Sequence, residues 1–197
     1  MAFLSIVIGY LLGAVSFSYL AGQIMKKLDI RDHGSGNAGA TNTLRVLGTG
    51  PAVAVLLLDC AKGIAAVWIG YSMSGGDPLF AALAGAASVI GHNWPVYFGF
   101  RGGKGVATTI GVLATIVFWP ALAAGIAAIA SIFITRYVSL GSLLFMTGTT
   151  ILLPFFNYPA VYFYTVLGLT ILSFWRHRTN IKRLISGTES RIGEKAS

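Results

Sequence analysis

Charged residues are scarce in this chain. Only 10% of its 197 residues are charged, whereas soluble domains carry about 25% charged residues. With 55% hydrophobic residues and a mean hydropathy of +0.76, the composition excludes an ordinary soluble domain and indicates an integral membrane protein. The single cysteine, Cys60, excludes a scaffold of intramolecular disulfides.

Acidic residues are the rarest of the charged groups, with 6 in the whole chain. They do not cluster at metal-ligand spacing, and the paired aspartates of a metal-dependent phosphotransferase are missing, so we expect neither a metal nor another cofactor. The chain has a net charge of +8, but its sequence contains no basic patch interleaved with aromatic residues. The charge therefore indicates membrane topology and attraction to anionic headgroups, and no nucleic-acid partner is expected.

Long apolar runs divide the chain into candidate membrane spans. A bilayer core about 30 Å thick needs about 20 apolar residues per helix, and fewer where the helix or bilayer adapts. The runs lack the period-two alternation of β-strands, so the predicted fold is an all-α integral membrane protein with about seven transmembrane helices in a single polytopic domain, 1–197. The third to fifth runs are short enough to be re-entrant or tilted halves of longer elements. The predicted spans are 3–25, 51–71, 78–90, 106–119, 121–134, 140–156 and 160–175.

Positive residues indicate the orientation, because they collect on the cytoplasmic side of membrane proteins. Lysines and arginines follow spans one, three, five and seven, whereas the alternate connections 72–77, 119–120 and 157–159 contain none. This distribution predicts an N-terminus outside and a C-terminus in the cytoplasm. It also predicts that the polar loops 35–45 and 92–104, the stretch 136–142 and the tail 176–183 gather at the cytoplasmic face.

Two glycine-rich loops on that face combine backbone flexibility with cations. Glycine lets the backbone approach a ligand closely, and a helix that begins after such a loop adds to its attraction for anions. The alternative, that the glycines only form turns, is weakened by the cations beside them. Neither loop is a nucleotide P-loop, since the residue after Lys104 is glycine and no hydroxyl is placed for magnesium. The candidate phosphate-binding residues are Ser35, Gly36, Asn37, Thr41, Asn42, Arg45, His92, Asn93, Arg101, Gly102, Gly103 and Lys104.

Other polar residues allow more than one role. Asp59 and Lys62 lie three residues apart within a span, where they form either a structural ion pair or a brace beneath a polar loop. His92 precedes a Trp-Pro turn and also fits plain helix-terminal hydrogen bonding. His177 fits a general base and fits equally a hydrogen-bonding scaffold or phosphate contact.

Three stretches of the chain resemble the bacterial PlsY family in their order and spacing. The third stretch also includes Gly187 and Glu189. The stretches are Ser35-Gly36-Asn37-x-Gly39-Ala40-Thr41-Asn42, then Gly91-His92-Asn93-Trp94-Pro95-Val96 continuing to Arg101-Gly102-Gly103-Lys104-Gly105-Val106-Ala107-Thr108, and Arg176-His177-Arg178-x-Asn180-Ile181-x-Arg183-Leu184.

The resemblance implies a membrane acyltransferase that moves a fatty acyl group from acyl-phosphate to glycerol 3-phosphate and gives lysophosphatidic acid. It places the enzyme in the bacterial inner membrane with its active site facing the cytoplasm. The His-x4-Asp pair of many glycerolipid acyltransferases is absent, because no histidine has an aspartate five residues later. An acyl-phosphate already carries an activated carbonyl, so positioning and charge stabilisation are the main requirements.

We expect Arg45, Lys104 and the loop 35–41 to bind the phosphates. Asn37, His177 and Asn180 would orient the hydroxyl or the developing oxyanion, and Ser142 would add a hydrogen bond. The expected catalytic residues are thus Lys104, His177, Asn180 and Ser142. The proton goes either to His177 or to a substrate phosphate.

Two further hypotheses remain open at the level of sequence. An acyl-serine at Ser35 or Ser142 is one, although neither has a neighbouring base in sequence. The other is a transporter of organic phosphates, which uses the same anion-binding loops. Transporters, however, usually bind their substrates near the bilayer midplane, between inverted repeats.

Overall fold

The computed structural model describes residues 1–193, so the last residues of the predicted domain, 194–197, lie outside the described part. Within the described residues the chain forms ten α-helices and three short 3-10 turns, and no strand. The contacts divide the chain into two compact units. The first runs from Met1 to Val112 and the second begins at Leu113.

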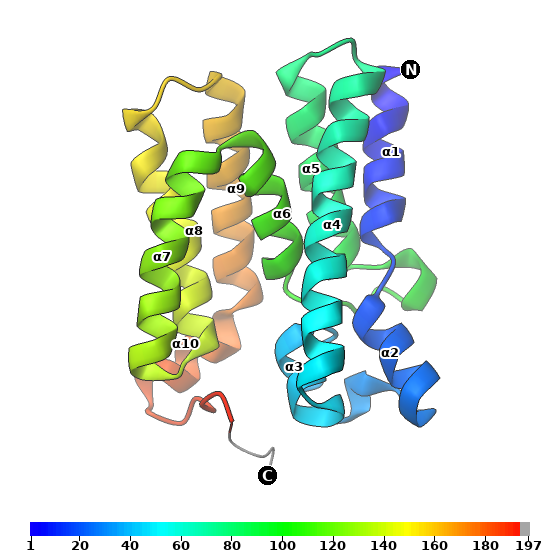
Figure 1. The fold of residues 1–197 in the computed structure, drawn as a ribbon, viewed down its shortest axis with the longest axis vertical. Coiled ribbons are helices and arrows are strands. Elements are labelled where there is room, and N and C mark those ends of the chain that lie inside the picture. Colours follow the sequence, from blue (N-terminus) through cyan, green and yellow to red (C-terminus); the bar gives the residue numbers. More distant parts are fainter. Residues whose placement is uncertain (194–197) are drawn as a thin grey trace. The chain divides into compact units, whose positions relative to one another are not determined.

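The first unit is built around three helices that run side by side (Figure 1). These are α1 (Ala2–Gly13), α4 (Thr49–Met73) and α5 (Pro78–Asn93). Two shorter helices, α2 (Phe17–Lys26) and α3 (Ala40–Leu47), pack against one end of α4, and the turns η1 (Ile30–Asp32) and η2 (Val96–Phe98) lie in the polar loops. The polar loops therefore belong to the same unit as the apolar helices that support them.

The predicted first span, 3–25, is divided into α1 and α2. The break lies at Ser16, whose backbone is extended and whose hydroxyl accepts a hydrogen bond from the Tyr19 N–H at 3.5 Å. Serine is a favoured N-cap because its side chain satisfies an amide that has no partner inside the helix. The apolar run therefore contains a helix start that its hydropathy does not reveal.

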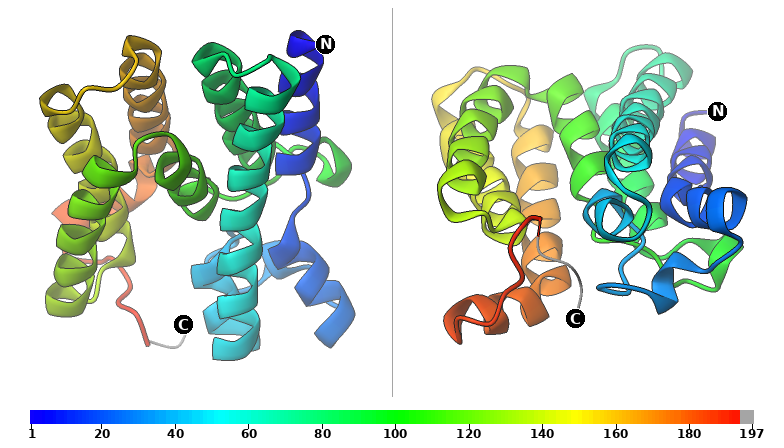
Figure 2. Two further views of the ribbon diagram at one scale, coloured as in Figure 1. Left: turned by 45° about the horizontal axis from the view of Figure 1, so that its top comes forward. Right: turned by 60° about the horizontal axis from the view of Figure 1, so that its bottom comes forward.

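The second unit contains helices α7 (Phe118–Thr135), α8 (Val138–Leu152), α9 (Ala160–Arg176) and α10 (Arg178–Ile185), with the turn η3 (Leu153–Phe155) after α8. Helix α6 (Val106–Ile116) begins in the first unit, and its last residues, from Leu113, belong to the second. Helix α9 ends at Arg176 with His177 as its cap, and the short α10 turns away and contacts both α8 and α9 (Figure 2).

Each predicted hydrophobic segment overlaps helical structure. The predicted connection at 119–120 is wrong, because α6 ends at Ile116 and α7 begins at Phe118, with Trp119 and Pro120 in its first turn. Among the described residues, four helical stretches are long and apolar enough to cross a membrane: Ala2–Lys26, Thr49–Met73, Phe118–Thr135 and Val138–Phe155. Helix α6 has 11 residues and is about 16 Å long at the usual rise, which is short of a bilayer core. The prediction of an all-helical membrane protein is confirmed, and the count of seven spans stays a prediction.

Candidate functional site

The polar residues predicted from the sequence fall into two clusters, one in each unit. The loop cluster, in the first unit, consists of residues 29–45 and 92–105. The tail cluster, in the second unit, consists of Ser139, Ser142, His177, Asn180, Arg183 and Glu189.

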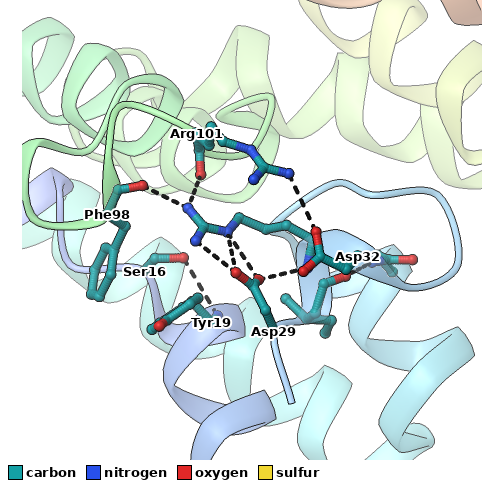
Figure 3. A network of polar contacts seen from close by, with 9 residues as sticks. Ser16, Tyr19, Asp29, Asp32, Phe98 and Arg101 are labelled. Atoms are coloured by element: carbon teal, nitrogen blue, oxygen red, sulfur yellow. Dashed lines mark hydrogen bonds and ion pairs between the residues drawn. The ribbon is translucent and has the colours of Figure 1, made fainter.

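Arg31 joins the two polar loops of the first unit. Its Nη1 donates to the carbonyl oxygens of Phe98 (2.6 Å) and Arg101 (3.2 Å), while Nε and Nη2 donate to the Asp29 carboxylate at 2.7 to 3.1 Å (Figure 3). Arg101 and Asp32 form a second, more exposed ion pair at 3.5 Å. The hydrogen bonds from Arg31 hold the pKa of the Asp29 carboxyl below its ordinary value, so the carboxylate stays ionised.

The first glycine-rich loop takes its shape from Asn42, which is fully buried on α3. Its Nδ2 donates to the carbonyl oxygens of Ile30 (2.9 Å) and His33 (3.0 Å), and its Oδ1 accepts from the Ser35 N–H at 2.8 Å. All of these bonds go to the loop backbone. Asn42 therefore fixes the loop, with Ser35 on the surface and Asn37 half-buried.

The second glycine-rich loop lies directly against His92 and Asn93 of α5. A Cβ on Gly103 would collide with His92 Nε2 and with the carbonyl oxygen of Ala38, so glycine is needed for this close approach. Gly105 has a φ of +79° and lies over the Asn93 Oδ1. Asn93 is fully buried, and neither its side-chain Oδ1 nor its Nδ2 has a hydrogen-bond partner among residues 1–193.

The loop cluster also contains two helix starts and two further cations, one of them directly before a helix start. Helix α3 begins after Gly39 with no side-chain cap, and α6 begins directly after Gly105. Lys104 precedes α6 and is half-buried, as is Arg45 on α3. Arg45 lies in the last turn of α3, and its guanidinium can bind a phosphate with two parallel hydrogen bonds.

Glu189 organises the tail cluster. Its Oε1 accepts from Ser139 Oγ (2.7 Å) and Asn180 Nδ2 (2.6 Å), and its Oε2 accepts from Arg183 Nε at 2.7 Å. Burial raises the pKa of this carboxyl, but the three hydrogen bonds lower it further, and the net pKa lies below the ordinary value. Glu189 thereby connects the end of the chain to both α8 and α10.

His177 and Ser142 also lie in this unit and are both buried. The His177 Nδ1 lies 2.8 Å from the Ser173 carbonyl oxygen, which only accepts, so Nδ1 carries the hydrogen and Nε2 of the neutral ring has the lone pair. Ser142 Oγ donates to the Val138 carbonyl oxygen at 2.8 Å. The ring thus has the tautomer that a general base at Nε2 requires.

The structure brings the predicted residues of the loops 35–45 and 92–104 together within one unit. Four contributors were absent from the predicted site: Arg31, Ser139, Arg183 and Glu189. Arg31 had a local signal, since Asp29 stands two residues before it, and Arg183 and Glu189 belong to the third stretch that carries the family resemblance. Ser139 had none. No three His, Cys, Asp or Glu side chains within residues 1–193 form a group that suits a metal ion.

These features define a class, a polytopic helical membrane protein with a glycine-rich, cationic loop cluster. A family model described as glycerol-3-phosphate acyltransferase matches residues 3–187. The chain belongs to this family.

Solved structures and a curated relative agree with that assignment. The chain is 62% identical over 196 residues to a glycerol-3-phosphate acyltransferase of Shouchella clausii, covering 97% of this chain and 96% of the relative. It is similar to the crystal structure of PlsY, an integral membrane glycerol 3-phosphate acyltransferase, in its glycerol 3-phosphate form, with a TM-score of 0.92, 38% identity and 98% and 96% of the two chains covered. The lysophosphatidic acid form of PlsY matches with a TM-score of 0.89 and 37% identity over 98% and 95% of the two chains.

Proposed function

We propose that this protein transfers a fatty acyl group from acyl-phosphate to glycerol 3-phosphate and forms 1-acyl-glycerol 3-phosphate. The family assignment supports the acyltransferase activity and glycerol 3-phosphate as the acceptor. The observation that carries the site assignment is the meeting of two glycine-rich loops, each leading into a helix, with Lys104 in the second loop. Arg45 lies in the last turn of the helix that follows the first loop. Acyl-phosphate as the donor follows from the resemblance of the three stretches.

In the proposed reaction the acceptor hydroxyl oxygen attacks the acyl carbonyl carbon. A new ester C–O bond forms, the C–O bond to phosphate breaks, and inorganic phosphate leaves with the electron pair. Phosphate is a good leaving group and the carbonyl is already activated, so direct transfer needs no acyl-enzyme intermediate, metal or other cofactor.

The loop cluster would bind the phosphates. Lys104 and Arg45 supply positive charge, and Arg101 lies at the rim of the cluster. The backbone at the start of α3 and α6 supplies N–H donors. Asn42 and Asn93 act through the shape of the loops, since both side chains are fully buried against them. The other proposed binding residues are Ser35, Gly36, Asn37, Thr41, His92, Gly102 and Gly103.

Residues of the tail cluster have the roles in the transfer step that were predicted for them from the sequence. With its hydrogen on Nδ1, His177 can accept the hydroxyl proton at Nε2, and a phosphate oxygen of the substrate is the alternative acceptor. Asn180 is oriented by its bond to Glu189 and would stabilise the oxyanion or align the hydroxyl. Ser142 would add a hydrogen bond.

The activity is tested with purified protein in detergent micelles. We expect lysophosphatidic acid to accumulate, detected by mass spectrometry, when acyl-phosphate and glycerol 3-phosphate are both present. A transporter would not convert its substrate without a sealed compartment. Absence of conversion with acyl-phosphate, but activity with another acyl donor, would contradict the donor assignment. An acyl adduct on Ser35 or Ser142 would contradict direct transfer.

Arg31 links the two polar loops, and its replacement is expected to disturb the phosphate site that they form. Arg31→Ala should raise the KM for glycerol 3-phosphate by about tenfold, because loss of the link lets the loops shift by a fraction of an ångström. Arg31→Lys should be impaired almost as much, since one ammonium cannot reproduce the fork that bridges Asp29 and Phe98. Steady-state kinetics checks this, with the exposed Lys27→Gln as the control. Normal kinetics in Arg31→Ala would contradict it.

The proposed orientation in the bacterial inner membrane puts the N-terminus outside and the C-terminus and active site in the cytoplasm. Cys60→Ala removes the single native thiol, and single cysteines can then be placed at Ser72, Asn157 and Ser186. A membrane-impermeant maleimide applied to intact spheroplasts should label the first two positions. Ser186→Cys should react only after lysis. The reverse labelling pattern would overturn the orientation.

A further inference from the structure

A buried charged cluster lies beneath the second glycine-rich loop, and it consists of Asp59 and Lys62 on α4 with His92 on α5. The Lys62 Nζ lies 2.7 Å from Asp59 Oδ1 and 3.0 Å from His92 Nδ1, and the same ring nitrogen lies 3.4 Å from Asp59 Oδ1. The three side chains are 1%, 1% and 5% exposed. An ion pair this deep in an apolar helix has a large desolvation cost, so its presence indicates more than local charge balance.

Lys62 extends the cluster to the start of the chain. Its ammonium donates to the Val15 carbonyl oxygen at 2.7 Å, at the break between α1 and α2. Carbonyl groups at a helix end lack partners inside the helix, and burial makes an unmet one costly. One lysine thus fixes the α1–α2 break, α4 and the ring of His92 relative to one another within the first unit.

His92 connects this cluster to the loop. An ammonium has donors only, so the His92 Nδ1 accepts from Lys62 and the ring hydrogen lies on Nε2. The Nε2 faces the backbone of Gly103, where a Cβ would overlap it. The His92 carbonyl oxygen also accepts from the Gly103 N–H at 3.1 Å. The ring and the backbone of one residue therefore contact the loop next to Lys104.

We propose that Asp59, Lys62 and His92 are positioning residues that hold the loop 101–105 in the geometry that presents Lys104 to a substrate phosphate. The proposal rests on the proposed function of the loop as a phosphate site. Charge on Asp59 fixes the Lys62 ammonium, the ammonium orients the His92 ring, and the ring supports Gly103. His92 would thus contribute to the phosphate site by supporting the loop from its buried side, and not by direct contact with the phosphate.

Two substitutions of His92 distinguish the roles of its two ring nitrogens. Glutamine reproduces the position of Nε2 against the loop, whereas asparagine reproduces Nδ1 and leaves the loop unsupported. In purified enzyme we expect His92→Asn to lower kcat/KM for glycerol 3-phosphate by about 100-fold and His92→Gln by much less, since small displacements of a binding group cost large factors in rate. Inorganic phosphate, as an inhibitor, should bind His92→Asn more weakly than the unchanged enzyme. Equal kinetics in the two variants would overturn the proposal.

The charge pair is tested by the double variant Asp59→Asn with Lys62→Met, since Asp59→Asn alone leaves an uncompensated buried charge and is expected to unfold the protein. The double variant removes both charges at similar volume, so no uncompensated buried charge remains. We expect a folded protein whose unfolding temperature is lowered by the loss of the hydrogen bond to Val15, with kcat/KM reduced by about tenfold or more. Normal kcat/KM in the folded double variant would show that the pair only balances charge. Cys60→Ala, on the same helix, is the matched control and should retain full activity.

Lys104→Ala, measured in the same series, separates a failure of the positioning role from a failure of the phosphate site itself. If Lys104→Ala is inactive while the His92 and Asp59–Lys62 variants are normal, the positioning role is wrong and the phosphate site stands. If Lys104→Ala is fully active, the proposed phosphate site itself fails.

Discussion

Replacing Lys104 with alanine is expected to lower kcat/KM for acyl transfer by about 1000-fold, the range seen when a charge that stabilises a transition state is removed. Lys104 stands between the glycine-rich loop and the start of α6, where backbone N–H groups favour an anion. In the reaction, negative charge builds up on the leaving phosphate and on the carbonyl oxygen. A cation placed there lowers the barrier more than it strengthens ground-state binding.

The measurement is steady-state formation of lysophosphatidic acid by purified protein in detergent. Lys104→Arg retains the charge but places it differently, so we expect a partial loss in kcat. Lys182→Ala is the matched control, because Lys182 is an exposed cation of α10 outside both clusters. Near-normal activity in Lys104→Ala would rule out the phosphate role, provided that the protein remains folded by its unfolding temperature.

Replacing Glu189 with alanine is expected to destabilise the second unit by about 2 kcal/mol, because it leaves the buried donors of Ser139 and Asn180 without an acceptor. Arg183 contributes less to this figure, since its side chain is 40% exposed. Activity should fall by more than the loss of folded protein explains, because Asn180 loses the bond that orients it. Glu189→Gln should lose less, since its amide oxygen still accepts from both donors.

The pH dependence of stability offers a second test of Glu189. Its folded-state pKa is lowered, so its stabilising contribution is complete above the unfolded-state pKa and is lost as the pH falls through the folded-state pKa. In the unchanged protein, protection of the tail from proteolysis should therefore decline below about pH 4. Glu189→Gln should lack that part of the decline. An unchanged pH profile in Glu189→Gln would contradict the role of the carboxylate.

Hydropathy located the helices well because burial in lipid requires long apolar runs whose backbone bonds are satisfied internally. The segment 51–71 corresponds to α4 and the segment 160–175 to α9 with only small differences at the ends. The division of 3–25 at Ser16 was not predicted, since it depends on a single capping serine within an apolar run. The number of membrane crossings depends on tilt and bilayer thickness, which residue counts do not fix.

The candidate site was predictable where glycine and cations stand together in sequence, as around Gly103 and Lys104. The predicted pairing of Asp59 with Lys62 is confirmed at 2.7 Å, because three residues place them on the same helix face. The contacts of Arg31 with Phe98 and of Ser139 with Glu189 join residues that lie 67 and 50 positions apart. Such contacts depend on tertiary packing, which has no local sequence signal.

The spacing of Asp59 and Lys62 also bears on how α4 enters the membrane during synthesis. A lone aspartate or lysine at the centre of a membrane helix costs about 3 kcal/mol on insertion scales. Because the two residues share one helix face, their ion pair needs only α4 itself to form, before α5 and His92 are in place. The helix can therefore pass from the translocon into lipid with its charges neutralised. If one of the two charges were on another helix, insertion of α4 would depend on a partner that is not yet in the membrane.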